Sequence, residues 1–386
     1  MTNAIFDLSN MFFRSMFIVG GYGKKQYTFD SQRELDQLMR KVATDVTAVI
    51  RSINPSRVIF ALDSKSWRKG ISIDENEGYK GHRKKAEHIN WDNVYKIMSD
   101  LAEILRTNEF IVSQIDNAEA DDLMALWRDE LLYNQKQHVI LISADEDVRQ
   151  LVNSITPAPN KTSYSVVYNP FTQGKNSSRK LFTPSGFGDW LKDEDDMGDI
   201  FNRSIDVDKE DFKRILNDKV VLEEINGDEI ALRKIFCGDD GDNVPAIFTW
   251  LNDKEKEIRI TPSKYQKILD YTGIKSWKDL SKKEDPIFEQ LVEISGQNPS
   301  FKMATRLDRQ IKLVVLDPSV FPEEIVKTFN NHLQGDYAKN HVSPQSWNML
   351  SMLEGTKYVS PAGKVSSGNE ASIFGQIDRI SNKELF

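Results

Sequence analysis

Three aspartates stand at the ends of short apolar runs in the first half of the chain. Asp7 ends Ala-Ile-Phe-Asp, Asp63 ends Val-Ile-Phe-Ala-Leu-Asp, and Asp145 follows Val-Ile-Leu-Ile-Ser-Ala. Such runs, rich in β-branched and aromatic residues, are typical of strands buried on both faces of a parallel sheet. Because the carboxyl ends of parallel strands line one crevice, we expect the three carboxylates to meet there.

Further acids occur at positions from which they could lie in the same crevice. Asp147 follows Asp145 by two residues, Glu119-Ala120-Asp121-Asp122 opens an expected helix, and Gly238-Asp239-Asp240-Gly241-Asp242-Asn243 forms a glycine turn. Each acid alone could be an ordinary helix cap or turn residue. Together, carboxylates in one crevice repel one another unless cations lie among them. Oxygen ligands favour Mg²⁺ or Mn²⁺ over zinc, and two such ions can support phosphodiester hydrolysis.

A basic segment follows Asp63 directly. Residues 65–85 contain seven Lys or Arg and three acids, a balance of +4 in a chain whose net charge is −8. Trp67 and Tyr79 lie within it and could offer faces on which bases stack. A solvated charged loop is the ordinary alternative. The position directly after Asp63 favours a positive cover over the carboxylate crevice.

The elements that must hold these groups alternate between strand-like and helix-like segments. The expected strands are 4–8, 58–62, 110–115 and 139–142, and the amphipathic helices between them are 35–53, 94–105 and 120–131. This order predicts an α/β fold with a mostly parallel central sheet flanked by helices.

Composition changes along the rest of the chain. We expect an α/β domain over 1–170 with a basic arch at about 64–90, and an inserted elaboration over 171–230. Residues 231–354 predict a smaller α-rich region, 355–371 a flexible linker, and 372–386 an apolar tail.

Composition also excludes several classes of protein. The chain has 386 residues, of which 39% are hydrophobic, so it can bury a large core. Its single cysteine, Cys237, excludes an internal disulfide framework and fits a reducing compartment, for which we expect the cytoplasm. The sequence shows no apolar run long enough for a membrane span, and we expect no signal peptide at its start.

Six blocks, in order, resemble the 5′-nuclease (flap endonuclease) superfamily, and within it the RNase H/5′-exonucleases of T-even-type bacteriophages. The blocks are Phe6-Asp7-Leu8-Ser9-Asn10, Phe60-Ala61-Leu62-Asp63, Tyr79-Lys80-Gly81-His82-Arg83, Ala118-Glu119-Ala120-Asp121-Asp122, Ser143-Ala144-Asp145-Glu146-Asp147 and Gly238-Asp239-Asp240-Gly241-Asp242-Asn243. The resemblance implies a PIN/5′-nuclease-like sheet and a helix–hairpin–helix-like C-terminal region that binds DNA. The glycine hairpin of many relatives is missing after Asn243. Lys264 and Lys267 could contact phosphates in its place, and the alternative is that they are surface lysines of an ordinary helix.

The resemblance also implies roles for individual residues. Two Mg²⁺ ions, replaceable by Mn²⁺, would be held by one set of acids each, with some sharing. The first ion would be held by Asp7, Asp63, Glu119, Asp121 and Asp145, and Asp122 would contact it through a water molecule. The second ion would be held by Asp147, Asp239 and Asp242. Lys80 and Arg83 would contact the scissile phosphate, and Tyr79 would stack on the neighbouring nucleotide. The segment around them would form an arch through which single-stranded 5′ ends pass.

These expectations amount to a metal-dependent 5′→3′ nuclease that removes RNA primers and adjacent DNA and cuts 5′ flaps or forks in phage DNA replication. The implied partners are DNA and RNA·DNA hybrids in the host cytoplasm, and we expect a monomer. The apolar tail either docks on a sliding clamp or single-strand-binding protein or folds back on its own domain as a final helix. Two alternatives stay open. One is a catalytically silent DNA-binding protein of the same fold. The other is a haloacid-dehalogenase-like phosphatase, although Asp7-Leu8-Ser9 lacks the Asp-x-Asp motif of that chemistry.

Overall fold

The computed structural model describes most of the chain. The described residues are 2–20, 27–73, 78–158, 161–171, 178–192, 207–217, 220–298, 302–339, 352–353, 356 and 358. The tail predicted at 372–386, most of the predicted linker, and the three acids of the basic segment lie outside them. Over the described part, a search for helices long and apolar enough to cross a membrane finds none.

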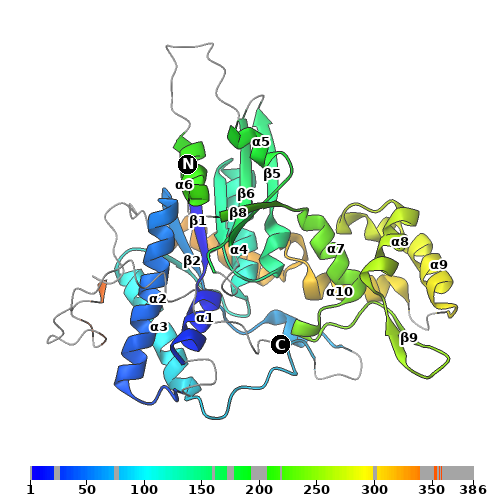
Figure 1. Cartoon of the computed structure of the whole chain (residues 1–386), viewed down its shortest axis with the longest axis horizontal. Helices are drawn as coiled ribbons and strands as arrows, with labels where there is room; N and C mark the ends of the chain where they lie inside the picture. Colours follow the sequence, from blue (N-terminus) through cyan, green and yellow to red (C-terminus); the bar gives the residue numbers. More distant parts are fainter. Residues whose placement is uncertain are drawn as a thin grey trace.

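The central sheet has eight strands, most of them parallel (Figure 1). Its order is β3-β2-β1-β4-β6-β7-β8, with β5 paired to β6. The strands are β1 (Thr2–Asp7), β2 (Arg57–Ala61), β3 (Ile111–Ser113), β4 (His138–Ile142), β5 (Asn153–Ala158), β6 (Lys161–Asn169), β7 (Arg179–Thr183) and β8 (Val220–Glu224). The first four confirm the predicted doubly wound core. The other four were not predicted individually, and β7 and β8 show that the segment after Asn169 extends this same sheet.

Helices cover both faces of the sheet, and others lie beside it. The helices of the described residues are α1 (Leu8–Gly20), α2 (Gln32–Ile53), α3 (Trp91–Thr107), α4 (Ala120–Asp129), α5 (Phe187–Lys192), α6 (Val207–Asn217), α7 (Gly227–Cys237), α8 (Pro262–Thr272), α9 (Glu284–Ser295), α10 (Met303–Val314), α11 (Glu323–Gln334) and α12 (Asp336–Lys339). Local signals set their ends: Ser31 accepts a hydrogen bond from the Glu34 amide at the start of α2, and Asn54 ends it in the left-handed conformation before Pro55.

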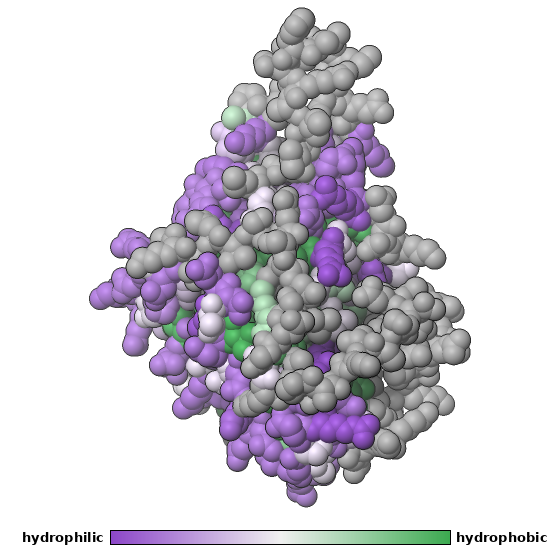
Figure 2. Space-filling model, turned by 90° about the vertical axis from the view of Figure 1, so that its left-hand side faces the viewer, coloured by the Kyte–Doolittle hydropathy of each residue, from purple (hydrophilic) through white to green (hydrophobic). Residues whose placement is uncertain are grey.

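Alternation along the strands divides the core into two layers. Ala4 and Phe6 of β1 pack with α1, α2 and α3, whereas Ile5 points to the other face, toward α4 and α11. Both faces are apolar because helices cover both of them. Figure 2 views the molecule from the α2 and α3 side, where the described surface is mostly hydrophilic with hydrophobic residues showing near its middle.

The region after β8 packs as a third cluster beside the sheet (Figure 1). Helices α7 to α10 supply most of its core, and Ile73 and Tyr79 from the basic segment are buried in it. A short antiparallel hairpin, β9 (Thr249–Leu251) with β10 (Glu257–Arg259), interrupts this otherwise helical region. It occupies the stretch where the sequence lacks the glycine hairpin of the related proteins.

One residue of the predicted linker is packed against the sheet domain. Tyr358 is 2% exposed, its hydroxyl donates to Asp100 of α3, and its carbonyl accepts from Arg40 of α2 (3.4 Å). Leu353 is buried in the same cluster. The chain therefore returns to α2 and α3 before the tail begins, and at Tyr358 the expectation of a free linker was wrong.

Candidate active site

The carboxyl edge of the sheet brings three predicted acids together. Asp7 is the last residue of β1 and lies opposite Ala61 of β2, two residues before Asp63. On the other side of β1, Phe6 lies opposite Ile142, the last residue of β4, three residues before Asp145. Since all three strands run parallel, their acids emerge at one edge.

Hydrogen bonds orient two of these acids. The Asn10 amide donates to Asp7 Oδ1 and the Ser143 hydroxyl to Asp7 Oδ2, both at 2.9 Å. Asp63 Oδ1 accepts from the Ala120 amide at 2.7 Å, at the start of α4. The partial positive charge of a helix N-terminus favours a carboxylate there. Asp7 and Asp63 are thus held at the edge by backbone and hydroxyl donors.

Burial and the repulsion between neighbouring carboxylates disfavour the ionised form of several of these acids. Burial, followed by the charge of Asp63, raises the pKa of Asp7 to about 7. The pKa values of Asp63 and Asp145 are also raised, in each case chiefly by burial. Burial and then the charge of Asp122 raise the pKa of Asp121 well above its usual range. The cations of the chain do not offset these effects, so the four carboxylates would be stabilised by an added cation.

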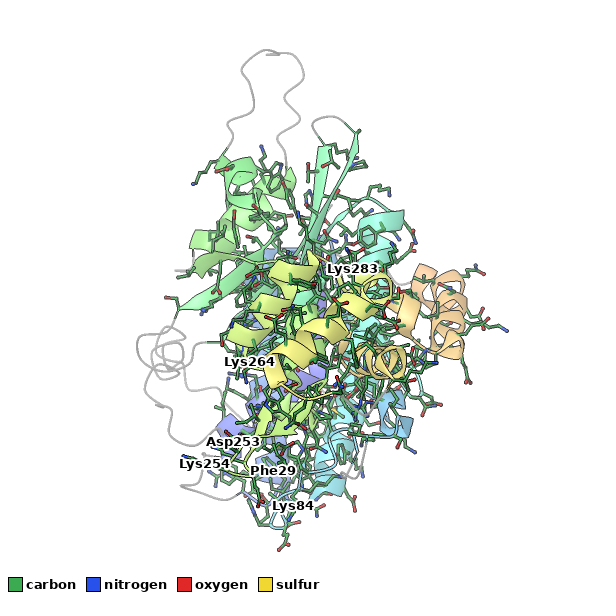
Figure 3. All side chains as sticks on the ribbon, turned by 90° about the vertical axis from the view of Figure 1, so that its right-hand side faces the viewer. Phe29, Lys84, Asp253, Lys254, Lys264 and Lys283 are labelled. Atoms are coloured by element: carbon green, nitrogen blue, oxygen red, sulfur yellow. The ribbon has the colours of Figure 1, made fainter. Side chains whose placement is uncertain are left out.

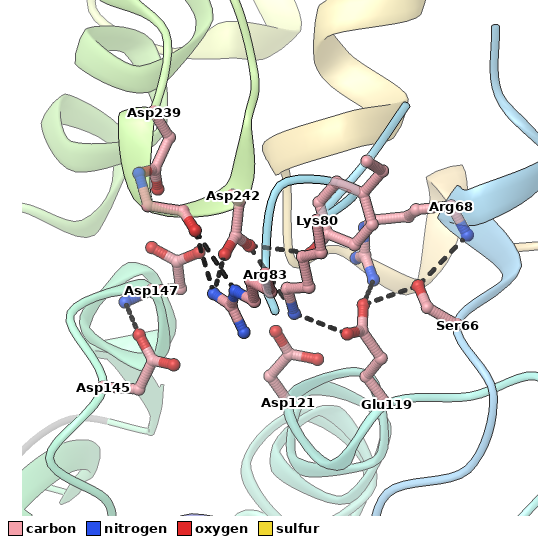
Figure 4. Close-up of polar contacts among 12 residues, drawn as sticks. Ser66, Arg68, Lys80, Arg83, Glu119, Asp121, Asp145, Asp147, Asp239 and Asp242 are labelled. Carbon is pink, nitrogen blue, oxygen red and sulfur yellow. Dashed lines mark hydrogen bonds and ion pairs between the residues drawn. The ribbon is translucent and has the colours of Figure 1, made fainter. Parts of the chain in front are cut away.

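Glu119 differs because cations of the chain already contact both of its oxygens (Figure 4). Oε1 accepts from Lys80 Nζ at 2.5 Å, and Oε2 accepts from Ser66 Oγ at 2.7 Å and from Arg68 at 3.1 Å. Burial alone would raise its pKa, but Lys80 and Arg68 lower that pKa to about 2. Glu119 is therefore ionised and anchored, and it could bind a metal ion only by sharing its oxygens with these donors.

Asp122 is occupied by structural contacts, which argues against its predicted role beside the metal. It is fully buried, Oδ1 accepts from Arg68 at 2.7 Å, and Oδ2 accepts from Trp67 Nε1 and the Glu119 amide at 3.1 and 3.0 Å. The amide contact is one half of a capping box that starts α4. Although its oxygens lie within 4.8 Å of those of Glu119 and Asp121, they face Arg68 and the backbone. Asp122 supports the site by holding Arg68.

The second predicted set also comes together. Carboxylate oxygens of Asp147, Asp239 and Asp242 lie within 4.8 Å of one another. Lys234 of α7, 8% exposed, contacts both Asp147 and Asp239. Burial opposes the charge of Asp239, but Lys234 outweighs it, and the pKa of Asp239 is lowered. A cation of the chain thus already neutralises part of this set.

An open cleft of about 480 Å³ lies over these residues. Its walls come from the loop after β4, from α7, from the glycine turn and from the start of α8. The residues are Arg83, Asp145, Glu146, Asp147, Arg233, Lys234, Cys237, Gly238, Asp239, Asp240, Gly241, Asp242, Arg259, Ile260, Thr261 and Pro262. The cleft opens Asp145, Asp147, Asp239 and Asp242 to solvent, so a charged substrate can approach these carboxylates.

The basic segment crosses between the two sets of acids, where Figure 4 shows Lys80 and Arg83. Lys80 Nζ is 2.5 Å from Glu119 and 3.5 Å from Asp242 Oδ2. Burial alone would lower the pKa of Lys80, but these two carboxylates raise it, so the side chain is a cation. Arg83 pairs with Asp242 and donates to the Gly241 carbonyl at 3.1 Å. The backbone at Lys80 is left-handed (φ 57°) and its amide donates to the Asp242 carbonyl at 2.9 Å.

The predicted stacking role of Tyr79 does not fit its position. The ring is 4% exposed within the cluster of the C-terminal helices, and its hydroxyl donates to Asp242 Oδ2 at 2.9 Å. A buried ring offers no face to a nucleotide. Trp67 is likewise engaged, because Arg68 lies 4.8 Å from its ring centre and Phe321 packs on its edge. Both aromatic residues hold the basic segment in place.

Sequence reasoning missed the structural roles of two basic residues, Arg68 and Lys234. Arg68 was counted only as one of seven basic residues, yet it is 1% exposed and pairs with Glu119 and Asp122. Lys234 was not singled out at all. Its only signal was its position on a helix that ends at the glycine turn carrying Asp239.

Comparison with known proteins identifies the class. Residues 2–173 match the family model of the 5′-3′ exonuclease, N-terminal resolvase-like domain. The match confirms the resemblance of this part of the chain to the 5′-nuclease superfamily. A sequence search of curated proteins finds no match.

Solved structures of bacteriophage T5 proteins are similar in outline. A 5′-exonuclease with bound zinc is 17% identical, with a TM-score of 0.47 over 87% of this chain and 100% of that chain. A flap endonuclease in a pseudo-enzyme–product complex with DNA and metal ions is 16% identical, with a TM-score of 0.45 over 88% and 100%. At these values nothing about the activity of this chain follows from the two structures.

Proposed function

We propose that the chain is a divalent-metal-dependent 5′→3′ nuclease that hydrolyses phosphodiesters of RNA·DNA hybrids and DNA and cuts 5′ flaps. The observation that carries the proposal is the meeting of Asp7, Asp63 and Asp145 at the sheet edge, beneath Lys80. The match of residues 2–173 to the 5′-3′ exonuclease family model supports the same chemistry.

The residues fit hard divalent cations such as Mg²⁺. Asp7, Asp63, Asp121 and Asp145 present only oxygen donors, and burial raises their pKa values more than the nearby cations of the chain lower them. Cations held there would activate a water molecule and act as Lewis acids on the scissile phosphate. A second ion at Asp147, Asp239 and Asp242 would have to share these acids with Lys234.

The basic residues would act on the phosphate directly. Lys80 lies between Glu119 and Asp242, and Arg83 is 55% exposed on its side chain while pairing with Asp242. When a phosphodiester enters the cleft, both can turn hydrogen bonds toward its non-bridging oxygens and stabilise the developing negative charge. The acids that hold them beforehand keep their orientation, which reduces the cost of ordering them during the reaction.

The C-terminal region would hold the duplex. Figure 3 shows Lys264 on α8, where its ammonium lies 4.2 Å from the ring centre of Trp250. The predicted phosphate contact Lys264 thus lies beside the β9–β10 hairpin. Lys267 is three residues further along the same helix, which starts at the cleft wall. We propose this region as the DNA-binding part and residues 1–170 as the catalytic part. The same proposal includes where the chain acts: on RNA primers during phage replication, in the host cytoplasm. It also includes a clamp or single-strand-binding protein that binds residues 372–386.

A nuclease assay tests the function. The chain is mixed with Mg²⁺ and 5′-labelled RNA·DNA hybrid or 5′-flap DNA. Short labelled products support the proposal, release of inorganic phosphate would indicate a phosphatase, and a shifted but uncut substrate would indicate a silent binder. Lys80→Ala should lower turnover far more than it lowers duplex affinity. Equal losses in both would contradict the role assigned to Lys80.

A further inference from the structure

Aromatic residues of α1 and α3 lie beside the basic segment, away from the residues predicted to stack, and Phe13 of α1 contacts Trp91 and Tyr95 of α3. Phe13 and Phe17 are four residues apart on α1, and Trp91 and Tyr95 are four residues apart on α3. Residues at this spacing share one face of a helix. The ring centres of Phe13 and Tyr95 are 6.4 Å apart, and those of Trp91 and Tyr95 are 6.0 Å apart. We call these four residues the aromatic shelf.

The shelf is open to solvent and carries a lysine. Phe17 is 44% and Tyr95 38% exposed, two of the five large hydrophobic residues exposed to this extent among those described. Lys85 Nζ lies 4.6 Å from the ring centre of Tyr95 and 5.6 Å from that of Trp91. Residues 83–96 contain four Lys or Arg against two acids. An exposed aromatic surface under positive charge therefore adjoins the cover of the active site.

The aromatic shelf lies a short distance from the carboxylates of the site. Helix α1 starts directly after Asp7, and six residues of helix, at 1.5 Å each, place Phe13 about 9 Å farther along the axis. From the other direction, Arg83 contacts Asp242, and Lys85 is two positions further along the chain, a reach of about 7 Å. A strand whose phosphate lies at the carboxylates would thus meet the shelf within its next few nucleotides.

We propose that the aromatic shelf binds the bases of a single-stranded nucleic-acid segment that continues from the scissile phosphate, with Lys85 contacting its backbone. Aromatic faces combined with lysines are the means by which proteins bind single strands without sequence preference. The cores of protein–protein interfaces, by contrast, are depleted in lysine. The proposal deepens the proposed function, since it names the part of the substrate that the same site takes.

Binding measured without divalent metal ion tests the shelf separately from catalysis. Fluorescence anisotropy compares the full chain on a duplex with a short 5′ single-stranded flap and on the same duplex without the flap. For Phe17→Ala/Tyr95→Ala, the affinity for the flapped duplex should fall about 5- to 150-fold for each base that loses its stacking partner, which is about 1–3 kcal/mol. Affinity for the unflapped duplex should not change.

Three controls make the result specific. Tyr95→Phe keeps the ring and should bind flaps as the unaltered chain does. Val221→Ala removes an exposed apolar side chain on β8, 48% exposed and outside the proposed catalytic and DNA-binding parts, and should change neither affinity. A flap whose first nucleotides are abasic should bind the unaltered chain as weakly as the normal flap binds the double variant.

Two outcomes would overturn the inference. One is unchanged flap affinity in Phe17→Ala/Tyr95→Ala, and the other is an equal loss for flapped and unflapped duplexes. The proposed function fails differently, by the absence of cleavage when Mg²⁺ is added to the unaltered chain. A chain that cuts flaps but shows no effect of the double variant would keep the function and lose the shelf.

Discussion

Replacing Asp7 with asparagine should stabilise the protein in the absence of divalent metal ions. Asp7 is 6% exposed, and its folded-state pKa of about 7 stands against an ordinary value of 3.8. At about 1.4 kcal/mol for each unit of pKa, ionised Asp7 costs the folded state about 4 kcal/mol at pH 8. Asparagine avoids this cost and can still accept the hydrogen bond from the Asn10 amide.

The sign of the pH dependence follows from proton binding. Between pH 3.8 and 7 the folded chain holds the Asp7 proton more tightly than the unfolded chain, so stability falls as pH rises through this window. The advantage of Asp7→Asn should therefore be about 4 kcal/mol at pH 8, about 2 kcal/mol at pH 5, and nearly absent at pH 4. Urea unfolding followed by tryptophan fluorescence in metal-free buffers measures it at each pH.

Asp122→Asn is the matched control because it should change stability in the opposite direction. It weakens a buried pair with Arg68, and removing one partner of such a pair costs about 3–5 kcal/mol. This loss should be the same with and without Mg²⁺. Added Mg²⁺ should stabilise the unaltered chain more than Asp7→Asn. The reasoning is refuted if metal-free Asp7→Asn is no more stable than the unaltered chain at pH 8.

Three further changes test the surrounding charges. Arg68→Ala should lower the free energy of unfolding by about 3–5 kcal/mol in urea, because it leaves Asp122 buried without its guanidinium; a loss under 1 kcal/mol would contradict the buried pair. Lys234→Met should lower the melting temperature of the metal-free chain, and added Mg²⁺ should raise the melting temperature of this variant more than that of the unaltered chain. If thermal unfolding shows that Mg²⁺ raises both melting temperatures equally, Lys234 does not compete with the metal ion. Asp240→Asn should change stability by less than about 1 kcal/mol and leave cleavage rates unchanged, since its pair with Arg259 is exposed; a tenfold slower rate would place Asp240 in the site.

Much of the site could be predicted from sequence because it depends on strand ends. A carboxylate that follows a buried apolar run emerges at the carboxyl edge of a parallel sheet wherever the helices lie. Asp7, Asp63 and Asp145 are of this kind, and the first four strands follow from the same apolar periodicity. Later strands such as Arg179–Thr183 and Val220–Glu224 have weaker periodicity, being intermediate in burial at several positions, and their pairing is not local.

Which side chains contact one another within the site depended on the tertiary structure. Asp121 and Asp122 are adjacent in sequence, yet one faces the carboxylate cluster and the other a buried arginine 54 residues earlier. The packing of Tyr79 into the C-terminal helices likewise removes a stacking face that the sequence suggested. Residue type and spacing determine which groups can bind an ion or a base. Only the long-range packing decides which of those groups the chain has already neutralised or buried, because that depends on contacts between segments far apart in sequence.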